Sequence, residues 1–360
     1  MKILYISPEN TVGLLTTWKK IHEMNGNTCD FVTMYQSKQG FDDGICLDLP
    51  FITTNYSYIY MRNLYYKMTR GKRGDQEIIS SIPPFNKTNA FEKIYYRLRD
   101  LIWRFKVEKA ITDYKLLDYD VYHFEWGMDI YRNCDFLKRV KNRKKIIIAN
   151  YHGQDIRTRG ILNDMDCLAD LNITSEADLI ELYPKLKLFF LPYDVQTSKP
   201  NFQVNQKIKI IHAPTNRYYK GSKKIIEVGH KLMDNYNIDF ELIENMEHGA
   251  LIKKKMNCDI LIDQVGDRGG WGYGMSSVES MAMGTCCATQ INDKLNNMIP
   301  DHPFLNITED NMYIKLSEII ENRPELEKRK RQSYDWVYQN HDMNNVIKNI
   351  YSLYNSLKYD

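Results

Sequence analysis

Residues 258–289 contain the residue types best suited to bind an anion. An apolar strand pattern ends at Asp263, and a glycine-rich loop that includes Gly272 and Gly274 follows it. A helical pattern then begins near Ser276. Glycines let backbone N–H groups approach an anion closely, and the start of a helix favours negative charge. The pattern therefore predicts a phosphate-binding site between this strand and this helix.

A carboxylate is expected in the first turn of the same helix, at Glu279. It could accept hydrogen bonds from the two hydroxyl groups of a ribose. Alternatively, it could only complement the positive end of the helix dipole. The residue pattern alone leaves both interpretations open.

A second candidate lies in residues 210–232, where Lys220 and Gly221 separate a predicted strand from a predicted helix. Arg217 precedes Lys220 by three residues. Two cations at such a position could stabilise the negative charge of a diphosphate leaving group without a metal ion. The alternative is an ordinary solvated loop before a helix.

A third candidate follows the predicted strand 145–150, where His152 is succeeded by Asp155 and Arg157. A histidine at a strand end can hydrogen-bond a sugar hydroxyl group, although it could also simply terminate the strand. We expect Asp155 and Arg157 to form a structural ion pair. Gly13 lies between the first strand and the first helix. No G-x-G-x-x-G motif accompanies Gly13, so a dinucleotide cofactor is not indicated.

The sequence GYGMSSVESMAMGTCCAT, residues 272–289, resembles the donor-binding signature of retaining GT-B glycosyltransferases of the family-four-like group (glycosyl transferases group 1). Lys220 and Gly221 match the Lys-Gly of that family, and His152 matches a histidine near its donor sugar. Two positions depart from the pattern. Trp271 stands where the family has a first glutamate, and Pro214 stands where it has an arginine, so that Arg217 is the nearest substitute.

The resemblance implies that His152, Lys220 and Glu279 are the catalytic residues. It also implies a set of donor-binding residues, namely Gly13, Arg217, Gly221, Asp263, Gly272, Tyr273, Gly274, Met275 and Ser276. The implied reaction moves a sugar from a nucleotide-diphosphate sugar, UDP- or GDP-linked, to a hydroxyl group of a glycan, a lipid or modified DNA. The anomeric configuration is retained, and no metal ion or cofactor is used. The alternatives are a sugar-nucleotide epimerase of the same fold and a non-catalytic relative that binds a nucleotide sugar or nucleic acid.

The elements that must position these residues alternate between strand and helix along the chain. This alternation is typical of an α/β fold, and we expect two Rossmann-like domains that face a cleft. The first domain is expected over residues 1–198 and the second over 199–335. Apolar residues recur at helical spacing from Val346 to Leu357. The segment 336–360 is therefore expected to form a helix that packs back on the first domain.

Residues 51–118 do not follow the alternating pattern. From Arg62 to Lys109 there are 12 Lys and Arg against 5 Asp and Glu, a local charge of +7. This basic segment could be a solvated face with an ordinary apolar stripe. It could also be an acceptor-binding surface for anionic polymers, phospholipid headgroups or nucleic acid.

The whole chain of 360 residues carries a net charge of only +3, which excludes a globally basic nucleic-acid-binding protein. No apolar run is long enough for a membrane span. The 7 cysteines are irregularly spaced and form no Cys-x-x-Cys motif. We therefore expect no disulfide framework and no metal site, and a cytoplasmic protein that could also associate peripherally with a membrane.

Overall fold

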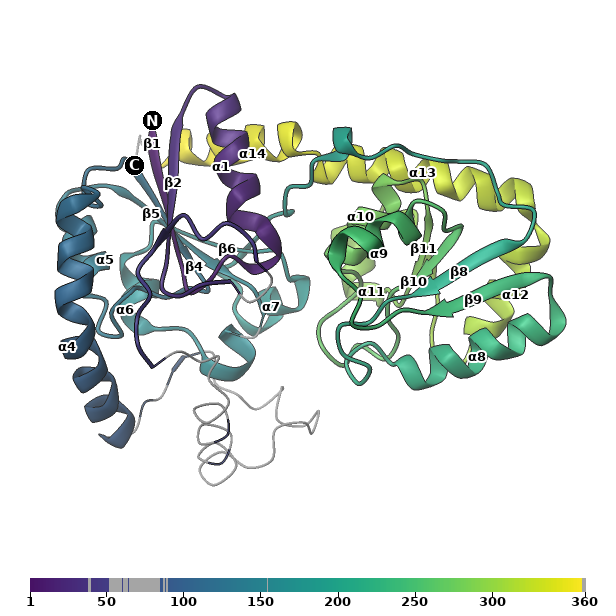
Figure 1. Ribbon diagram of the computed structural model, residues 1–360, viewed down its shortest axis with the longest axis horizontal. Helices are drawn as coiled ribbons and strands as arrows, with labels where there is room; N and C mark the ends of the chain where they lie inside the picture. The colour runs from purple at the N-terminus through teal and green to yellow at the C-terminus, as the bar shows by residue number, and fades with distance from the viewer. Residues whose placement is uncertain are drawn as a thin grey trace. The chain divides into compact units, whose positions relative to one another are not determined.

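The computed structural model describes residues 1–37, 40–51, 90–153 and 155–357, together with residues 60, 64, 85, 86 and 88. It divides into two compact units, and each is built on a parallel sheet with flanking helices (Figure 1). Unit 1 comprises Met1–Phe189 and Ile347–Asp360, and unit 2 comprises Phe190–Val346. The predicted fold class, α/β with two Rossmann-like sheets, is confirmed.

Unit 1 contains a sheet of seven strands in the order β3-β2-β1-β4-β5-β6-β7, and every neighbouring pair is parallel. Its strands are β1 (Lys2–Ser7), β2 (Thr28–Thr33), β3 (Ile45–Cys46), β4 (Val121–Glu125), β5 (Ile146–Tyr151), β6 (Leu171–Thr174) and β7 (Lys187–Leu188). Its helical segments are η1 (Thr11–Gly13), α1 (Leu14–Met24), α4 (Ala90–Asp113), α5 (Asp135–Asn142), the π-helical turn η2 (Asp155–Arg159), α6 (Asn163–Leu168) and α7 (Ala177–Leu182).

The side chains of the central strands of unit 1 alternate between two buried faces, as expected for a parallel sheet covered on both sides. Leu4 and Phe124 belong to the core cluster that includes residues of α4 and α5. On the opposite face, the ring of Tyr5 stacks on His123 at 4.3 Å and on Trp18 of α1 at 5.9 Å. The C-terminal helix α14 (Met343–Ser356) reaches this second face, because the hydroxyl group of Tyr354 lies 2.5 Å from His123 Nε2.

Unit 2 contains a five-stranded sheet in the order β12-β11-β10-β8-β9, again parallel throughout. Its strands are β8 (Ile208–His212), β9 (Ile238–Leu242), β10 (Ile260–Ile262), β11 (Cys286–Thr289) and β12 (Leu305–Asn306). Its helices are η3 (Val195–Thr197), α8 (Ser222–Asn235), α9 (His248–Lys255), α10 (Met275–Ala282), α11 (Asp293–Met298), α12 (Met312–Glu321) and α13 (Arg323–His341).

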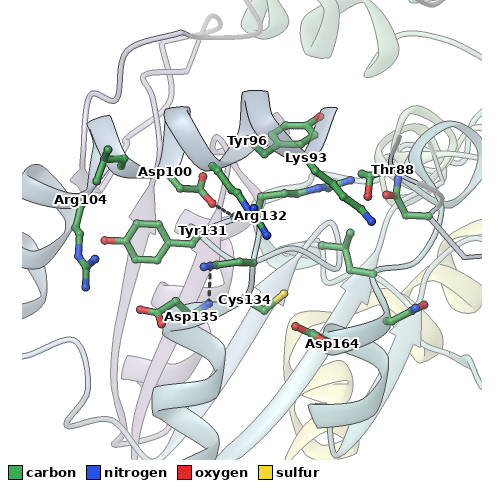
Figure 2. Close-up of a pocket in the computed structure, with 16 residues that line it drawn as sticks. Thr88, Lys93, Tyr96, Asp100, Arg104, Tyr131, Arg132, Cys134, Asp135 and Asp164 are labelled. Carbon is green, nitrogen blue, oxygen red and sulfur yellow. Dashed lines mark hydrogen bonds between the residues drawn. The ribbon is translucent and has the colours of Figure 1, made fainter. Parts of the chain in front are cut away.

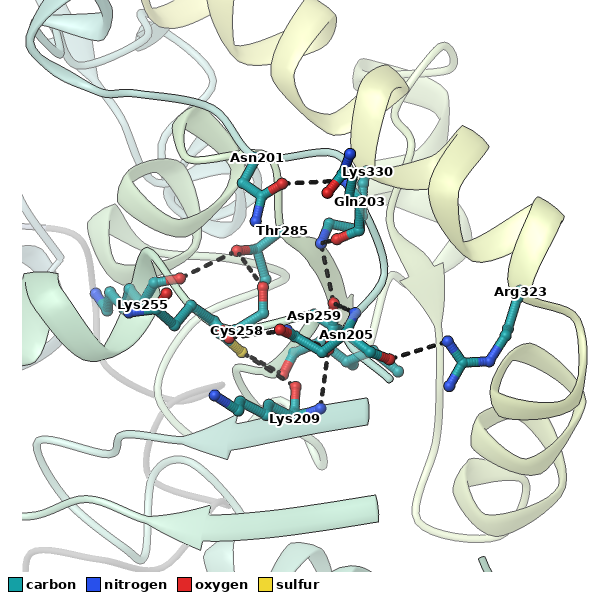
Figure 3. Close-up of polar contacts among 12 residues, drawn as sticks. Asn201, Gln203, Asn205, Lys209, Lys255, Cys258, Asp259, Thr285, Arg323 and Lys330 are labelled. Carbon is teal, nitrogen blue, oxygen red and sulfur yellow. Dashed lines mark hydrogen bonds and ion pairs between the residues drawn. The ribbon is translucent and has the colours of Figure 1, made fainter. Parts of the chain in front are cut away.

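A buried carboxylate ties the start of unit 2 to its last long helix. Asp259 accepts hydrogen bonds from the side chain of Asn205 at 2.8 Å and from the backbone N–H of Lys209 at 2.9 Å (Figure 3). Its other oxygen lies 3.0 Å from the Nζ atom of Lys330 on α13, and both side chains are at most 1% exposed. This buried and fully bonded pair fixes the entry into β8 against α13.

The unit boundaries at 190 and 347 differ from the expected positions, 199 and 336. The physical reason is aromatic packing. Phe190 packs on Trp336 at 6.0 Å, and the N–H of Tyr193 donates to the carbonyl of His341 at 2.7 Å. The segment 190–198 and α13 are therefore held together as parts of unit 2. Of the basic segment 62–109, most residues before Ala90 lie outside the described residues.

Candidate functional site

The centre of the site in unit 2 is an ion pair between Lys220 and Asp263. Lys220 precedes α8 and Asp263 follows β10, so both lie at the carboxyl-terminal edge of the sheet. The Nζ atom of Lys220 lies 2.5 Å from Asp263 Oδ1 and 3.1 Å from Gln264 Oε1. Burial alone would raise the pKa of the Asp263 carboxyl, but the nearby Lys220 and two further hydrogen bonds outweigh it and lower that pKa. Asp263 is therefore a carboxylate that holds the ammonium group in place.

The second oxygen of Asp263 binds the start of α10. It accepts hydrogen bonds from the backbone N–H of Gly274 at 3.1 Å and from the hydroxyl group of Ser277 at 2.6 Å. A Cβ atom at Gly274 would lie 4.0 Å from Lys220 Nζ. The helix start and the ammonium group are thus neighbours, as an anion site requires. The amide of Gly274 is used by Asp263, so the helix amides left to meet an anion are those of Met275 and Ser276.

Gly221 brings the loop before α8 against the loop after β10. Its φ is +66°, and a Cβ atom there would lie 2.4 Å from the carbonyl oxygen of Val265. The N–H of Val265 donates to the carbonyl of Lys220 at 3.2 Å. Only glycine combines this conformation with this close approach. The sequence-predicted Lys-Gly pair therefore places Lys220 next to the glycine-rich loop.

Glu279 lies in the second turn of α10, not in the first, where the sequence analysis expected it. The helix begins at Met275, because Gly274 is extended and ends the loop. This position weakens the interpretation that Glu279 only complements the helix dipole, whose effect is confined to the first turn.

The carboxylate of Glu279 is held between two side chains of α9, those of Lys255 and His248. Its Oε2 atom lies 2.5 Å from Lys255 Nζ, and its Oε1 atom lies 3.0 Å from His248 Nε2. Lys255 is only 1% exposed. Burial alone would raise the pKa of Glu279, but His248 and Lys255 lower it. The hydrogen bond that Glu279 accepts from His248 in turn raises the pKa of His248.

Arg217 lies on the surface and is engaged by a carboxylate. Its guanidinium group binds Glu244 through Nε at 2.7 Å and through a terminal nitrogen at 2.5 Å. Hydrogen bonding and charge from Glu244 raise the pKa of Arg217 and lower that of Glu244. The structure therefore shows Arg217 and Lys220 each bonded to a different carboxylate.

Gly272 and Tyr273 have structural contacts in unit 2. Gly272 has a φ of +76°, and a Cβ atom there would lie 2.2 Å from Leu295 Cδ2. The hydroxyl group of Tyr273 lies 3.0 Å from His341 Nε2, and its ring packs at 4.8 Å from that of Phe304. Both residues thus shape the loop that leads into α10.

In unit 1, His152 follows β5 and pairs with the last residue of β4, Glu125. His152 Nε2 lies 2.5 Å from Glu125 Oε2, and Asn150 donates a hydrogen bond to the same carboxylate oxygen at 3.1 Å. Burial alone would lower the pKa of His152, but Glu125, followed by Asp155 and Glu176, raises it. The imidazole ring lies 5.5 Å from the ring of Trp126. This arrangement can hold a proton on His152 at the edge of the sheet.

The predicted ion pair between Asp155 and Arg157 is wrong. Asp155 instead accepts the backbone N–H of His152 at 2.8 Å. Arg157 pairs with Asp178 at 2.6 Å and with Glu176 at 2.9 Å. The two residues lie two positions apart in the π-helical turn η2, where side chains at that spacing diverge.

Gly13 ends η1 and caps α1. Its φ is +71°, and a Cβ atom there would lie 3.0 Å from the ring of Phe41. The structure thus brings together Lys220, Gly221, Asp263, Gly274, Met275 and Ser276, places Glu279 on the same helix α10, and keeps His152 and Gly13 in unit 1.

Sequence reasoning missed Lys255, His248 and Glu125, the partners of Glu279 and His152. Lys255 is the last of three consecutive lysines in α9, and only its burial distinguishes it from the other two. Glu125 ends β4, the strand that pairs with β5 directly before His152, and this adjacency could have revealed the pair.

Neither a family model nor a curated protein sequence matches this chain. Solved structures do match it in fold. The apo structure of OtsA superposes with a TM-score of 0.62 at 10% identity and covers 99% of both chains. A structure of trehalose-6-phosphate from E. coli bound with UDP-2-fluoro glucose gives a TM-score of 0.61 at 11% identity, again over 99% of both chains.

A third solved structure is an alpha-glucosyltransferase in complex with UDP-glucose and DNA containing an abasic site. It gives a TM-score of 0.57 at 11% identity and covers 98% of this chain and 99% of that one. These three similarities extend over nearly the whole chain. They show that this protein has the fold of the GT-B glycosyltransferases.

Proposed function

We propose that this protein is a retaining glycosyltransferase that moves a sugar from a nucleotide-diphosphate sugar to a hydroxyl group. The observation that carries the proposal is the position of Lys220, whose ammonium group lies beside Gly274 at the start of α10. A cation that faces a helix start is suited to a diphosphate, because both groups stabilise negative charge.

The donor diphosphate would bind between Lys220 and the amides of Met275 and Ser276. The side chain of Lys220 is 18% exposed, and Asp263 fixes the position of its ammonium group. Arg217 would supply a second cation by turning from Glu244, since its side chain is 58% exposed. Such fixed charges stabilise the leaving diphosphate without a metal ion.

Glu279 would accept hydrogen bonds from hydroxyl groups of the donor ribose. Its side chain is 15% exposed, and its carboxylate stays ionised because His248 and Lys255 lower its pKa. A carboxylate that accepts two hydroxyl donors gains charge-assisted hydrogen bonds. His152 would hydrogen-bond the transferred sugar, and Gly13 would leave room for the donor at the β1–α1 turn.

A uridine nucleotide is the donor base that we propose. Three solved structures of the same fold were determined with UDP-glucose or UDP-2-fluoro glucose. One of them also contains DNA, so the acceptors to test include a hydroxyl group of modified DNA besides glycans and lipids.

No helix in the described part of the chain has the length and apolar character needed to cross a membrane. We propose a cytoplasmic enzyme.

In the proposed reaction, the acceptor oxygen attacks the anomeric carbon on the face from which the diphosphate leaves. The bond between the anomeric carbon and the phosphate oxygen breaks, and the new glycosidic bond forms. The leaving phosphate oxygen takes the acceptor proton, so atoms and charge balance and the configuration is retained. The protein contributes position and charge stabilisation, chiefly through Lys220.

The test is a screen of nucleotide sugars, beginning with UDP-glucose, in the presence of EDTA. Thermal unfolding shows which donor stabilises the protein, and mass spectrometry detects the slow hydrolysis of that donor. We expect Lys220→Ala to lower turnover by about 10²-fold or more, in line with the loss of one charge-stabilising contact. The matched control is Lys223→Ala, an exposed lysine of α8. Equal turnover in the two variants would contradict the proposal, and a donor isomerised without acceptor would indicate an epimerase instead.

A further inference from the structure

Unit 1 contains a cavity of about 540 Å³ beneath the N-terminal half of α4. Figure 2 shows α4 above it and the loops that lead into α5 and α6 below it. Three cations of α4 line this cavity, and a fourth comes from the loop before α5: Lys93, Arg97, Arg104 and Arg132. We call this cavity the α4 pocket.

The four cations of the α4 pocket, three from α4 and Arg132 from the loop before α5, differ from the other cations of α4. Arg99, Lys106 and Lys109 each pair with a carboxylate. Among the residues that the structure describes, no carboxylate lies within ion-pair distance of Lys93, Arg97, Arg104 or Arg132. An excess of positive charge is therefore concentrated around the cavity.

Two of the three acidic residues that line the pocket are already engaged. Asp100 binds Arg99 at 2.7 Å and also accepts the backbone N–H of Arg132 at 2.8 Å. Asp164 pairs with Lys138 at 2.5 Å. Of the described residues that line the pocket, Asp135 is the remaining acidic one, so among them four unpaired cations face one unpaired carboxylate, an excess of three positive charges.

Arg132 is the least solvated of these cations. Its guanidinium group lies 4.8 Å from the centre of the Tyr96 ring, which offers a favourable but weak contact. Burial lowers the pKa of Arg132 to about 10, and the nearby Arg159 and Arg99 act in the same direction. A half-buried guanidinium group among other cations is stabilised by an anion that binds it.

We propose that the α4 pocket binds the phosphate group of a small phosphorylated molecule, with Arg132, Arg97 and Lys93 as its main ligands. A guanidinium group presents paired donors that match phosphate oxygens, and the local excess of charge suits a dianion. The cavity has the size of a small-molecule site, which favours a phosphate ester of low mass over a polymer.

The position of the pocket suggests that this molecule is the acceptor. The loop after β4 begins next to Glu125, the partner of His152, and reaches Arg132 within the same connection. The loop after β5 likewise begins at His152 and leads to the start of α6. The phosphate group of an acceptor would thus bind at the sheet edge that carries His152. The assignment of the phosphorylated molecule as the acceptor rests on the proposed function, whereas the proposal that the pocket binds a phosphate group does not.

The first experiment measures binding of inorganic phosphate to the full chain by calorimetry, against chloride at equal ionic strength. We expect Arg132→Gln and Arg97→Gln each to weaken phosphate binding by about 10-fold, the loss of one charge-assisted hydrogen bond. The control is Lys106→Gln, a cation of α4 outside the pocket, which should bind phosphate as the wild type does. Equal binding by all three variants, or no preference of the wild type for phosphate over chloride, would overturn the proposal.

The second experiment identifies the source of the phosphate group with a panel of sugar phosphates and UDP-glucose. Transfer to a sugar phosphate, with a KM raised by Arg132→Gln and an unchanged kcat, identifies the acceptor. If phosphate binding changes only the rate of donor hydrolysis, the bound molecule is a phosphorylated effector and not the acceptor. The α4 pocket is then still its binding site. Binding of DNA that falls steeply with salt and that phosphate esters do not displace would overturn the small-molecule assignment.

Discussion

Asp263 holds the ammonium group of Lys220 at 2.5 Å with one carboxylate oxygen, while its other oxygen binds Ser277 and the N–H of Gly274. A single buried side chain therefore connects the cation that would face a diphosphate to the helix start that would bind the same group. Because both are fixed before a ligand arrives, little reorganisation is needed when charge develops on the leaving group.

The substitution Asp263→Asn tests this connection. It keeps the size of the side chain but removes the charge that positions Lys220, so we expect kcat/KM for the donor to fall by about 10- to 100-fold. The control is Asp239→Asn, an exposed partner of Lys207 in the same unit, which should leave kcat/KM unchanged. A normal kcat/KM in Asp263→Asn would show that the ion pair does not position Lys220.

Gly221 and Gly26 offer a matched pair for testing the close approach at the site. Both have a left-handed φ, +66° and +74°, but only Gly221 would place a Cβ atom against a backbone oxygen. We expect Gly26→Ala to lower the stability of the fold by about 1 kcal/mol, the cost of the left-handed conformation for alanine. Gly221→Ala should cost more and should also weaken donor binding. Thermal unfolding and donor titration of both variants check this, and an equal loss of stability would contradict it.

Much of the fold could be predicted from the sequence, because long apolar runs without alternation are typical of buried parallel strands. Apolar runs at residues 2–7 and 145–150 predict two strands, which agree with β1 and β5 to within about one residue. The strand β6, with the sequence LNIT, was missed because it is short and half polar. The apolar run at residues 188–192 also predicts a strand, but the structure has only β7, Lys187–Leu188, because the chain leaves the sheet edge after two residues.

The candidate site was predictable in its residue types but not in its pairings. Lys220 and Gly274 could be selected because a Lys-Gly and a glycine loop have recognisable patterns. The local sequence pattern around a residue does not specify which carboxylate pairs with which cation. Lys220 and Asp263 are 43 positions apart, and Lys255 and Glu279 are 24 apart. These contacts arise only when the sheet brings separate loops to one edge.

The buried pair of Lys255 and Glu279 gives a prediction about stability. Glu279→Ala would leave the ammonium group of Lys255, which is 1% exposed, without its carboxylate. We expect this variant to be destabilised by about 3–5 kcal/mol, the typical cost of breaking a buried pair on one side. The control is Glu241→Ala, which removes the exposed partner of the neighbouring Lys254 and should cost at most about 1 kcal/mol. Denaturant unfolding measures both, and similar values would show that Lys255 is solvated.

The pair of His152 and Glu125 predicts a dependence of stability on pH in unit 1. Because the folded-state pKa of His152 is raised by Glu125, protonated His152 stabilises the fold. This contribution is fully present below the unfolded value of about 6.5 and is lost as the pH rises through the raised pKa. The difference in unfolding free energy between the wild type and His152→Asn should therefore shrink as the pH rises above about 6.5. Glu125→Gln should lower the pKa of His152 measured by NMR, and a pKa that does not change in this variant would contradict the assignment.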